Sequence, residues 1–182
     1  MAEHILVATD GSVSGDNAVT LAARLALALG LDLKIAHVRM HDRPAEEWLR
    51  MAEIEHLVDD VTPGPRLEGL EAGRVLADLL ERGRSDAQAA QALTTLGEQV
   101  LERASERAHK MGARRIKTRL LWGDTADAIL ELAASERPQM LVMGSRGLGR
   151  LRGAVLGSVS QKVLHHAPCA VVISPAPQPG KA

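Results

Sequence analysis

Apolar segments of two kinds alternate along this chain, and this alternation constrains the fold more than any other feature. Short runs without helical period are typical of buried strands, and longer segments with apolar residues every three or four positions are typical of amphipathic helices. A strand pattern at His4–Thr9 is followed by a helical pattern from Ser14 to Leu29, which Gly30 ends, and by a second strand pattern at Leu33–Val38. These segments predict a right-handed βαβ unit with parallel strands.

The same alternation resumes in the second half of the chain. A long amphipathic helical pattern runs from Ala92 to Met111, and a further helix opens at Gly123-Asp124. The remaining predicted elements are strands at 116–122, 140–143 and 170–173 and a short helix at 158–165. The sequence therefore predicts an α/β fold, with one doubly wound, Rossmann-like parallel sheet of five strands and helices on both faces.

The segment at about 39–85 interrupts this pattern. Pro44 is placed to begin a helix that runs to about Val58, and Thr62-Pro-Gly-Pro65 separates it from a weaker helical pattern at 67–80. We interpret the segment as a helical insertion in a single domain that spans residues 1–182.

Charge and composition exclude several classes of function. The 22 Lys and Arg residues nearly balance the 23 Asp and Glu residues, which argues against nucleic-acid binding by bulk charge. With two Trp residues and no Phe or Tyr, the chain lacks an aromatic ladder for single-stranded nucleic acid. No charge-free apolar stretch approaches the roughly 18 residues of a membrane span, and the first residues do not resemble a signal peptide, so we expect a cytoplasmic protein without membrane insertion. The single cysteine, Cys169, excludes an intramolecular disulfide.

The positive charge is concentrated in one region. Residues 138–182 contain no acidic residue and have a net charge of +5, whereas residues 1–137 have a net charge of −6. This basic region includes a loop between the fourth strand and the helix at Ser158, with glycines at 144, 147, 149, 153 and 157 and arginines at 146, 150 and 152. Glycines permit positive φ and close approach, and a helix N-terminus offers free N–H groups, so the loop predicts a phosphate cradle. The alternative is a loop that only makes tight turns.

Several other candidates have structural explanations. Asp10 could end the first strand and cap the next helix, and Asp124 and Asp127 are spaced to complement a helix dipole. The adjacent His165 and His166 have no third ligand nearby, which disfavours a zinc site. Cys169 is expected to be a small core residue.

The motif Gly144-x2-Gly147-x9-Gly157-Ser158 resembles the nucleotide-binding signature of the universal stress protein family, in its ATP-binding branch. Three other segments resemble the family in the same order along the chain, at 5–12, 123–130 and 166–172. The resemblance covers nearly the whole chain except about 39–85.

The resemblance implies the sheet order 3-2-1-4-5, which places Asp10 and Gly144 across one crevice. It implies that Ala8, Thr9 and Asp10 lie beside the nucleoside, with Ala8 standing where some members have proline. It implies that the main chain of Val38 meets the adenine edge. The other residues that it implies are Met143 and Gly144 on the floor, and Arg146, Gly147, Gly157, Ser158, Val159 and Ser160 around ribose and phosphates.

These residues favour an ATP-binding regulatory protein of the stress response, with ADP or AMP as alternatives and Mg²⁺ bound through water at Asp10. No catalytic residue is assigned, and the alternatives are a slow ATP hydrolase and a nucleotide-free dimeric interaction module. The family resemblance also implies a homodimer that pairs through Ala170–Ile173. A regulated protein is expected as a further partner.

Overall fold

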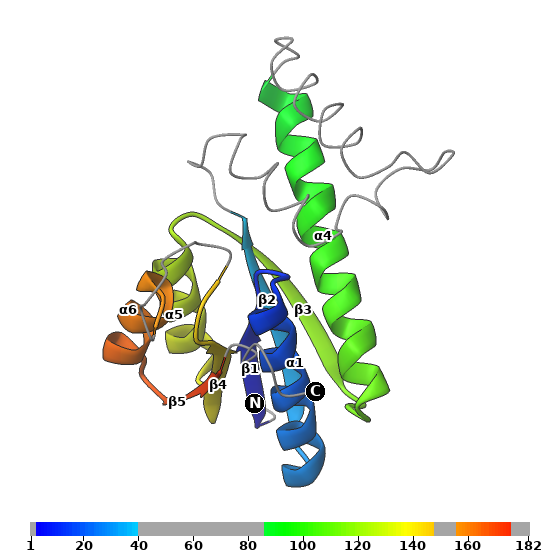
Figure 1. The fold of residues 1–182 in the computed structure, drawn as a ribbon, viewed down its shortest axis with the longest axis vertical. Coiled ribbons are helices and arrows are strands. Elements are labelled where there is room, and N and C mark those ends of the chain that lie inside the picture. Colours follow the sequence, from blue (N-terminus) through cyan, green and yellow to red (C-terminus); the bar gives the residue numbers. More distant parts are fainter. Residues whose placement is uncertain (1–2, 40–85, 148–155, 176–182) are drawn as a thin grey trace, which may run out of the picture. The chain divides into compact units, whose positions relative to one another are not determined.

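The computed structural model describes residues 3–39, 86–147 and 156–175 (Figure 1). These residues form, in chain order, β1 (His4–Ala8), α1 (Val13–Leu29), β2 (Asp32–Arg39), α4 (Asp86–Lys110), β3 (Ile116–Trp122), α5 (Thr125–Glu136), β4 (Met140–Gly144), α6 (Ser158–His166) and β5 (Ala170–Ser174). The strands form one parallel sheet in the order β3-β2-β1-β4-β5. The predicted fold class and strand order are confirmed.

Two apolar clusters, one on each face of the sheet, hold the fold together. Alternate residues of a strand point to opposite faces. In β1, Ile5 and Val7 therefore pack against α1 and the last part of α4, whereas Leu6 and Ala8 pack against α5 and α6. All five β1 residues are buried, as expected for a central parallel strand that is covered on both faces.

The ends of the helices follow from local sequence. Gly30 adopts a left-handed conformation with φ of 69° and ends α1 as predicted. Asp124 caps α5 by accepting hydrogen bonds from the backbone N–H groups of Ala126 and Asp127. The predicted structural role of Asp124 and Asp127 at this helix N-terminus is confirmed.

The chain divides into two units. One comprises Met1–Met40 and Gly97–Ala182 and contains the whole sheet; the other comprises His41–Leu96, of which the structure describes residues 86–96 of α4. The helices predicted at 44–58 and 67–80 lie outside the described residues, and so does nearly all of the predicted insertion. None of the described helices is both long enough and apolar enough to span a membrane.

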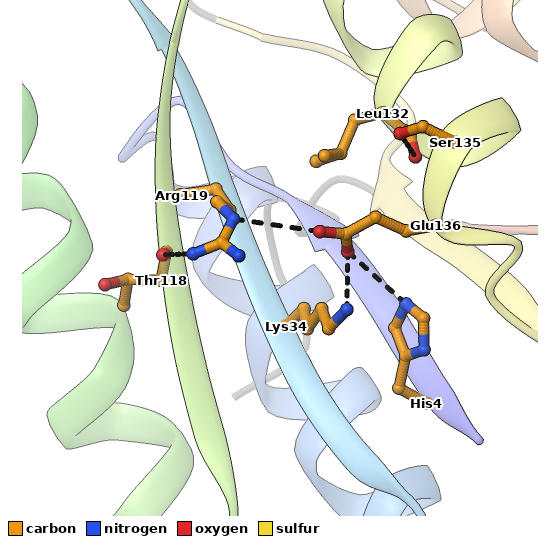
Figure 2. Close-up of polar contacts among 7 residues, drawn as sticks. All are labelled: His4, Lys34, Thr118, Arg119, Leu132, Ser135 and Glu136. Atoms are coloured by element: carbon orange, nitrogen blue, oxygen red, sulfur yellow. Dashed lines mark hydrogen bonds and ion pairs between the residues drawn. The ribbon is translucent and has the colours of Figure 1, made fainter. Parts of the chain in front are cut away.

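Glu136 ties the C-terminal end of α5 to three strands of the sheet (Figure 2). Its carboxylate lies 2.7 Å from Lys34 Nζ, 3.6 Å from His4 Nε2 and 3.7 Å from Arg119 Nε. The side chains of Glu136 and Lys34 are largely buried, so little water replaces the contact if the carboxylate is lost.

We expect Glu136→Gln to lower the free energy of unfolding by about 1–3 kcal/mol, because it leaves positive charge near the sheet without its counter-charge. Urea unfolding measures the change. The matched control is Glu131→Gln, an exposed position on the same helix, for which we expect a change within about 0.5 kcal/mol. Equal effects of the two substitutions would contradict this role of Glu136.

Candidate functional site

The candidate site lies at the carboxyl ends of β1 and β4. These strands are neighbours in the sheet, with Ala8 opposite Met143. The connection from β1 leads to β2 on one side, and β4 lies on the other side, so the strand order reverses between β1 and β4. Open α/β sheets bind ligands at such a switch point.

The turn after β1 is fixed by its own side chains. The Asp10 carboxylate atom Oδ1 accepts hydrogen bonds from Ser12 N at 3.1 Å and Ser12 Oγ at 2.6 Å. Gly11 has a φ of 80° and donates its N–H to Thr9 Oγ1 at 3.2 Å. The cap of α1 is Ser12, whose Oγ accepts from Gly15 N, so the alternative in which Asp10 caps the helix is wrong.

The loop after β4 comes very close to this turn. A Cβ atom on Gly147 would lie 2.5 Å from Asp10 Oδ2, and a Cβ atom on Gly144 would lie 2.6 Å from Ser14 Oγ. A side chain at 144 would also meet the Ser14 backbone at 3.0 Å, whereas a side chain at 147 would require the Asp10 carboxylate to move. The structure therefore brings Asp10, Gly144 and Gly147 together.

The glycines of this loop do not supply positive φ where the structure describes them. Gly144, Gly147 and Gly157 are absent from the positive-φ glycines of the described residues, so that part of the prediction is wrong for these three. Close approach is the observed reason for glycine at 144 and 147. Gly149 and Gly153 lie outside the described residues.

The N-terminus of α6 follows the same loop. Gly157 is the N-cap residue, and its N–H donates to the Ser145 carbonyl at 2.8 Å. The cap has no side-chain hydrogen bond among the described residues. The exposed Ser158 and the half-buried Val159 form the first turn, where backbone N–H groups lack helical partners.

Ser160 and the arginines of this loop are the remaining polar residues that the sequence analysis places in the site. Ser160 is buried, and its hydroxyl donates to the Gly144 carbonyl at 2.9 Å. This hydrogen bond ties α6 to β4. Arg146 is half-buried beside Gly147, and Arg150 and Arg152 lie outside the described residues.

Apolar side chains line the other side of this edge. Ala8, Val38 and Met143 are buried and belong to the cluster on the α5 and α6 face. Leu121 and Ala126 pack in the same cluster, and the sequence analysis missed them. The alternating pattern of β3 and the first turn of α5 indicate that these two residues are at least partly buried. Placing them beside the site also requires the strand register, which the sequence alone does not provide.

The backbone of Val38 faces the space beyond the end of β1. Thr9 N donates to the Ala36 carbonyl at 3.0 Å, and the ladder between β1 and β2 ends at Ala8 and Ala36. Alternate residues of a parallel strand direct their N–H and C=O groups at the same neighbour. Val38 therefore presents a donor and an acceptor on the β1 side, past the last ladder pair.

His37 is a further residue that the sequence analysis missed. It is 5% exposed, and its Nδ1 lies 2.9 Å from the Thr9 carbonyl oxygen. A carbonyl only accepts, so Nδ1 carries the proton of the neutral ring. Burial lowers the pKa of His37, and the hydrogen bond to Thr9 and the negative charge of Asp10 partly oppose this shift.

We expect the contribution of His37 to stability to be pH-dependent. Because the folded-state pKa lies below the unfolded value of about 6.5, the unfolded chain binds the proton first, and stability is lost as the pH falls below about 6.5. The difference in free energy of unfolding between the wild type and His37→Asn should therefore shrink by at most about 1.4 kcal/mol per pH unit. Urea unfolding between about pH 8 and pH 5.5 measures it, and a constant difference would contradict the expectation.

Comparison with known proteins identifies the family. The model of the universal stress protein family matches residues 1–175. The chain belongs to the universal stress protein family. Among curated members, it is 29% identical to the universal stress protein YxiE of Bacillus subtilis over 175 residues. The aligned residues make up 95% of this chain and 99% of YxiE. The chain spans 51% to 61% of the length of three other curated universal stress proteins, from Thermus aquaticus and Mycobacterium tuberculosis.

Solved universal stress proteins share the fold. One, in complex with cAMP, superposes with a TM-score of 0.59 at 24% identity and covers 97% of this chain and 98% of that chain. A second, from Arabidopsis thaliana with AMP bound, has a TM-score of 0.57 at 17% identity and covers 96% of this chain and 92% of that chain. At this identity the two structures establish the fold of this universal stress protein, and their ligands are properties of those proteins.

Proposed function

We propose that this universal stress protein binds ATP at the carboxyl edge of β1 and β4 and acts as a regulatory protein of the stress response. The observation that carries the proposal is the contact between the two loops at the switch point. A Cβ atom on Gly147 would lie 2.5 Å from Asp10 Oδ2, so the two loops meet at the carboxyl edge of β1 and β4. Open α/β sheets bind ligands at this edge.

The nucleoside would lie over the apolar side of this edge. The Val38 N–H and C=O match the ring nitrogen acceptor and the amino donor of adenine. Ala8 and Met143, which are buried in the cluster on the α5 and α6 face, would lie beneath the base, beside Thr9. The Asp10 carboxylate would accept a hydrogen bond from a ribose hydroxyl.

The phosphates would lie at the N-terminus of α6. Backbone N–H groups of Ser158 and Val159 and the positive end of the helix dipole favour an anion there. Gly157 allows close approach, and Arg146 supplies positive charge from the neighbouring loop. A bound Mg²⁺ would be held mainly by phosphate oxygens and water, with Asp10 as the carboxylate of the site.

The identity of the nucleotide is tested by calorimetry on protein stripped of bound ligands, with ATP, ADP and AMP as separate titrants. We expect saturable binding of ATP. Binding of AMP or ADP alone would support an adenine nucleotide site of different phosphate preference, in keeping with the relative that has AMP bound. No binding of any of the three would overturn the proposal and favour a nucleotide-free interaction module.

Slow ATP hydrolysis is the alternative function, and the Asp10 carboxylate beside the loop is the feature that favours it. Asp10→Asn separates the two proposals in a time course of phosphate release. Turnovers on the scale of seconds that vanish in Asp10→Asn would replace the regulatory proposal with an enzyme.

We also propose a homodimer through β5, which is an edge strand of the sheet that the described residues form. Val171 is half-buried and lies outside both apolar clusters, as expected for a residue available to a partner. Sedimentation at micromolar concentration should give a dimer, and Val171→Asp should give a monomer. A wild-type monomer would contradict the proposal. A dimer through this edge would leave the nucleotide site free to regulate a further protein partner.

A further inference from the structure

His37 is a buried imidazole behind the nucleotide site. It lies in β2 on the face covered by α1 and α4, opposite to the face on which the Val38 side chain packs. A hydrogen bond joins its Nδ1 to the carbonyl of Thr9, the residue before Asp10. His37 therefore contacts the turn that carries the site, from the side away from the proposed base.

We propose that His37 is a positioning residue for the nucleotide site. Its Nδ1–H fixes the Thr9–Asp10 peptide plane and thereby the direction of the Asp10 carboxylate. This inference rests on the proposed function for its ligand, but its structural part concerns the chain alone.

One peptide bond links the imidazole to Asp10. In a trans peptide, the carbonyl of Thr9 and the N–H of Asp10 point in opposite directions. The imidazole holds the carbonyl toward the α4 face, so the Asp10 N–H is directed away from it. Asp10 Oδ1 accepts two hydrogen bonds from Ser12, so the carboxylate is tied to the turn that this peptide begins.

The other polar groups of Thr9 already have hydrogen-bond partners. Its N–H donates to the Ala36 carbonyl at 3.0 Å, and its Oγ1 accepts from Gly11 N at 3.2 Å. The imidazole completes the set. Without it, a buried carbonyl loses its partner, and the turn must move to satisfy that carbonyl.

The imidazole itself is packed against α4. A Cβ atom on Gly97 of α4 would lie 3.3 Å from His37 Cδ2 and 2.7 Å from Leu120 Cδ1, so the helix backbone lies directly against the ring. One turn later, Val100 Cγ2 would lie 3.3 Å from a Cβ atom on Gly11. The same segment of α4 therefore supports both the imidazole and the turn that it positions.

The test compares His37→Asn with His37→Leu. The asparagine amide can donate a hydrogen bond from near the position of Nδ1, whereas leucine has a similar size and no donor. We expect His37→Leu to weaken ATP binding about tenfold in calorimetry and His37→Asn to retain most of the wild-type affinity. Both variants lose stability in urea unfolding, so stability alone would not separate them.

Two results would overturn the inference. In the first, both variants bind ATP like the wild type. In the second, both lose affinity equally, which indicates a packing role without positioning. If His37→Leu does not fold, ¹⁵N NMR of the wild-type imidazole decides instead: a proton on Nδ1 supports the inference, and a proton on Nε2 overturns it.

Failure of the proposed function is distinguishable from failure of this inference. If the wild type binds no adenine nucleotide, the amide resonances of Asp10 and Gly11 in the ligand-free variants still report the turn. Shifts that are large in His37→Leu and small in His37→Asn support positioning. Shifts that are equal in the two variants, or absent in both, overturn it.

Discussion

Replacing Gly157 by valine should weaken ATP binding about tenfold or more and leave the fold intact. Gly157 has a φ of −75° and a ψ of 162°, which any residue can adopt. Among the described residues other than its chain neighbours, the atom nearest to a Cβ atom there would be Arg146 Cα at 3.6 Å, in ordinary van der Waals contact. The branched side chain would nevertheless stand at the N-cap of α6, in front of the N–H groups proposed to hold the phosphates.

The free energy of unfolding should change by no more than about 1 kcal/mol in this variant. Valine is a poorer N-cap residue than glycine, but it also reduces the conformational freedom of the unfolded chain, and the two effects oppose each other. Calorimetry with ATP and urea unfolding measure affinity and stability separately. Gly157→Ala is the matched control, with a smaller loss of affinity expected from its single methyl group. Undiminished affinity in the valine variant would mean that the loop is only a turn.

The fold could be predicted from sequence because its signals are local. Each predicted strand is present, and its observed ends differ from the predicted ends by one residue at most. Gly30 ends α1 and Asp124 begins α5, as expected. The start of α4 is the exception. It begins at Asp86, six residues before the first apolar position used in the prediction.

The site could be predicted only in part, because its details depend on contacts between distant segments. Parallel topology alone implies that the loops after β1 and β4 meet. It does not say that Gly147 touches the Asp10 carboxylate or that Ser160 donates to Gly144.

His37 was missed for the same reason. One histidine in a strand has no distinguishing pattern, and its role depends on the register that places it beside Thr9.

Gly144 has the opposite role to Gly157, although both belong to one motif. A Cβ atom on Gly144 would lie 2.6 Å from Ser14 Oγ and 3.0 Å from both the carbonyl carbon and the carbonyl oxygen of Ser14. The hydroxyl could rotate, but the backbone of α1 can yield only if the helix shifts away from the sheet. The Gly144 carbonyl also accepts the hydrogen bond from Ser160, so a shift at this position reaches α6 as well.

We therefore expect Gly144→Ala to lower the free energy of unfolding by about 2–3 kcal/mol, the upper part of the range for an overpacked core. Ser14→Ala is the control, because Ser14 Oγ is buried without a hydrogen-bond partner among the described residues and its removal should be close to neutral. In the double variant that combines Gly144→Ala with Ser14→Ala, the Cβ atom at 144 no longer meets a hydroxyl at 14, but it still meets the backbone of residue 14. Only part of the lost stability should return, and full recovery in urea unfolding would contradict a backbone clash. Loss of ATP binding in Gly144→Ala would then accompany loss of stability, whereas in Gly157→Val it would occur alone. The two variants would thus distinguish the glycine that α1 packs against from the glycine that we propose the phosphates approach.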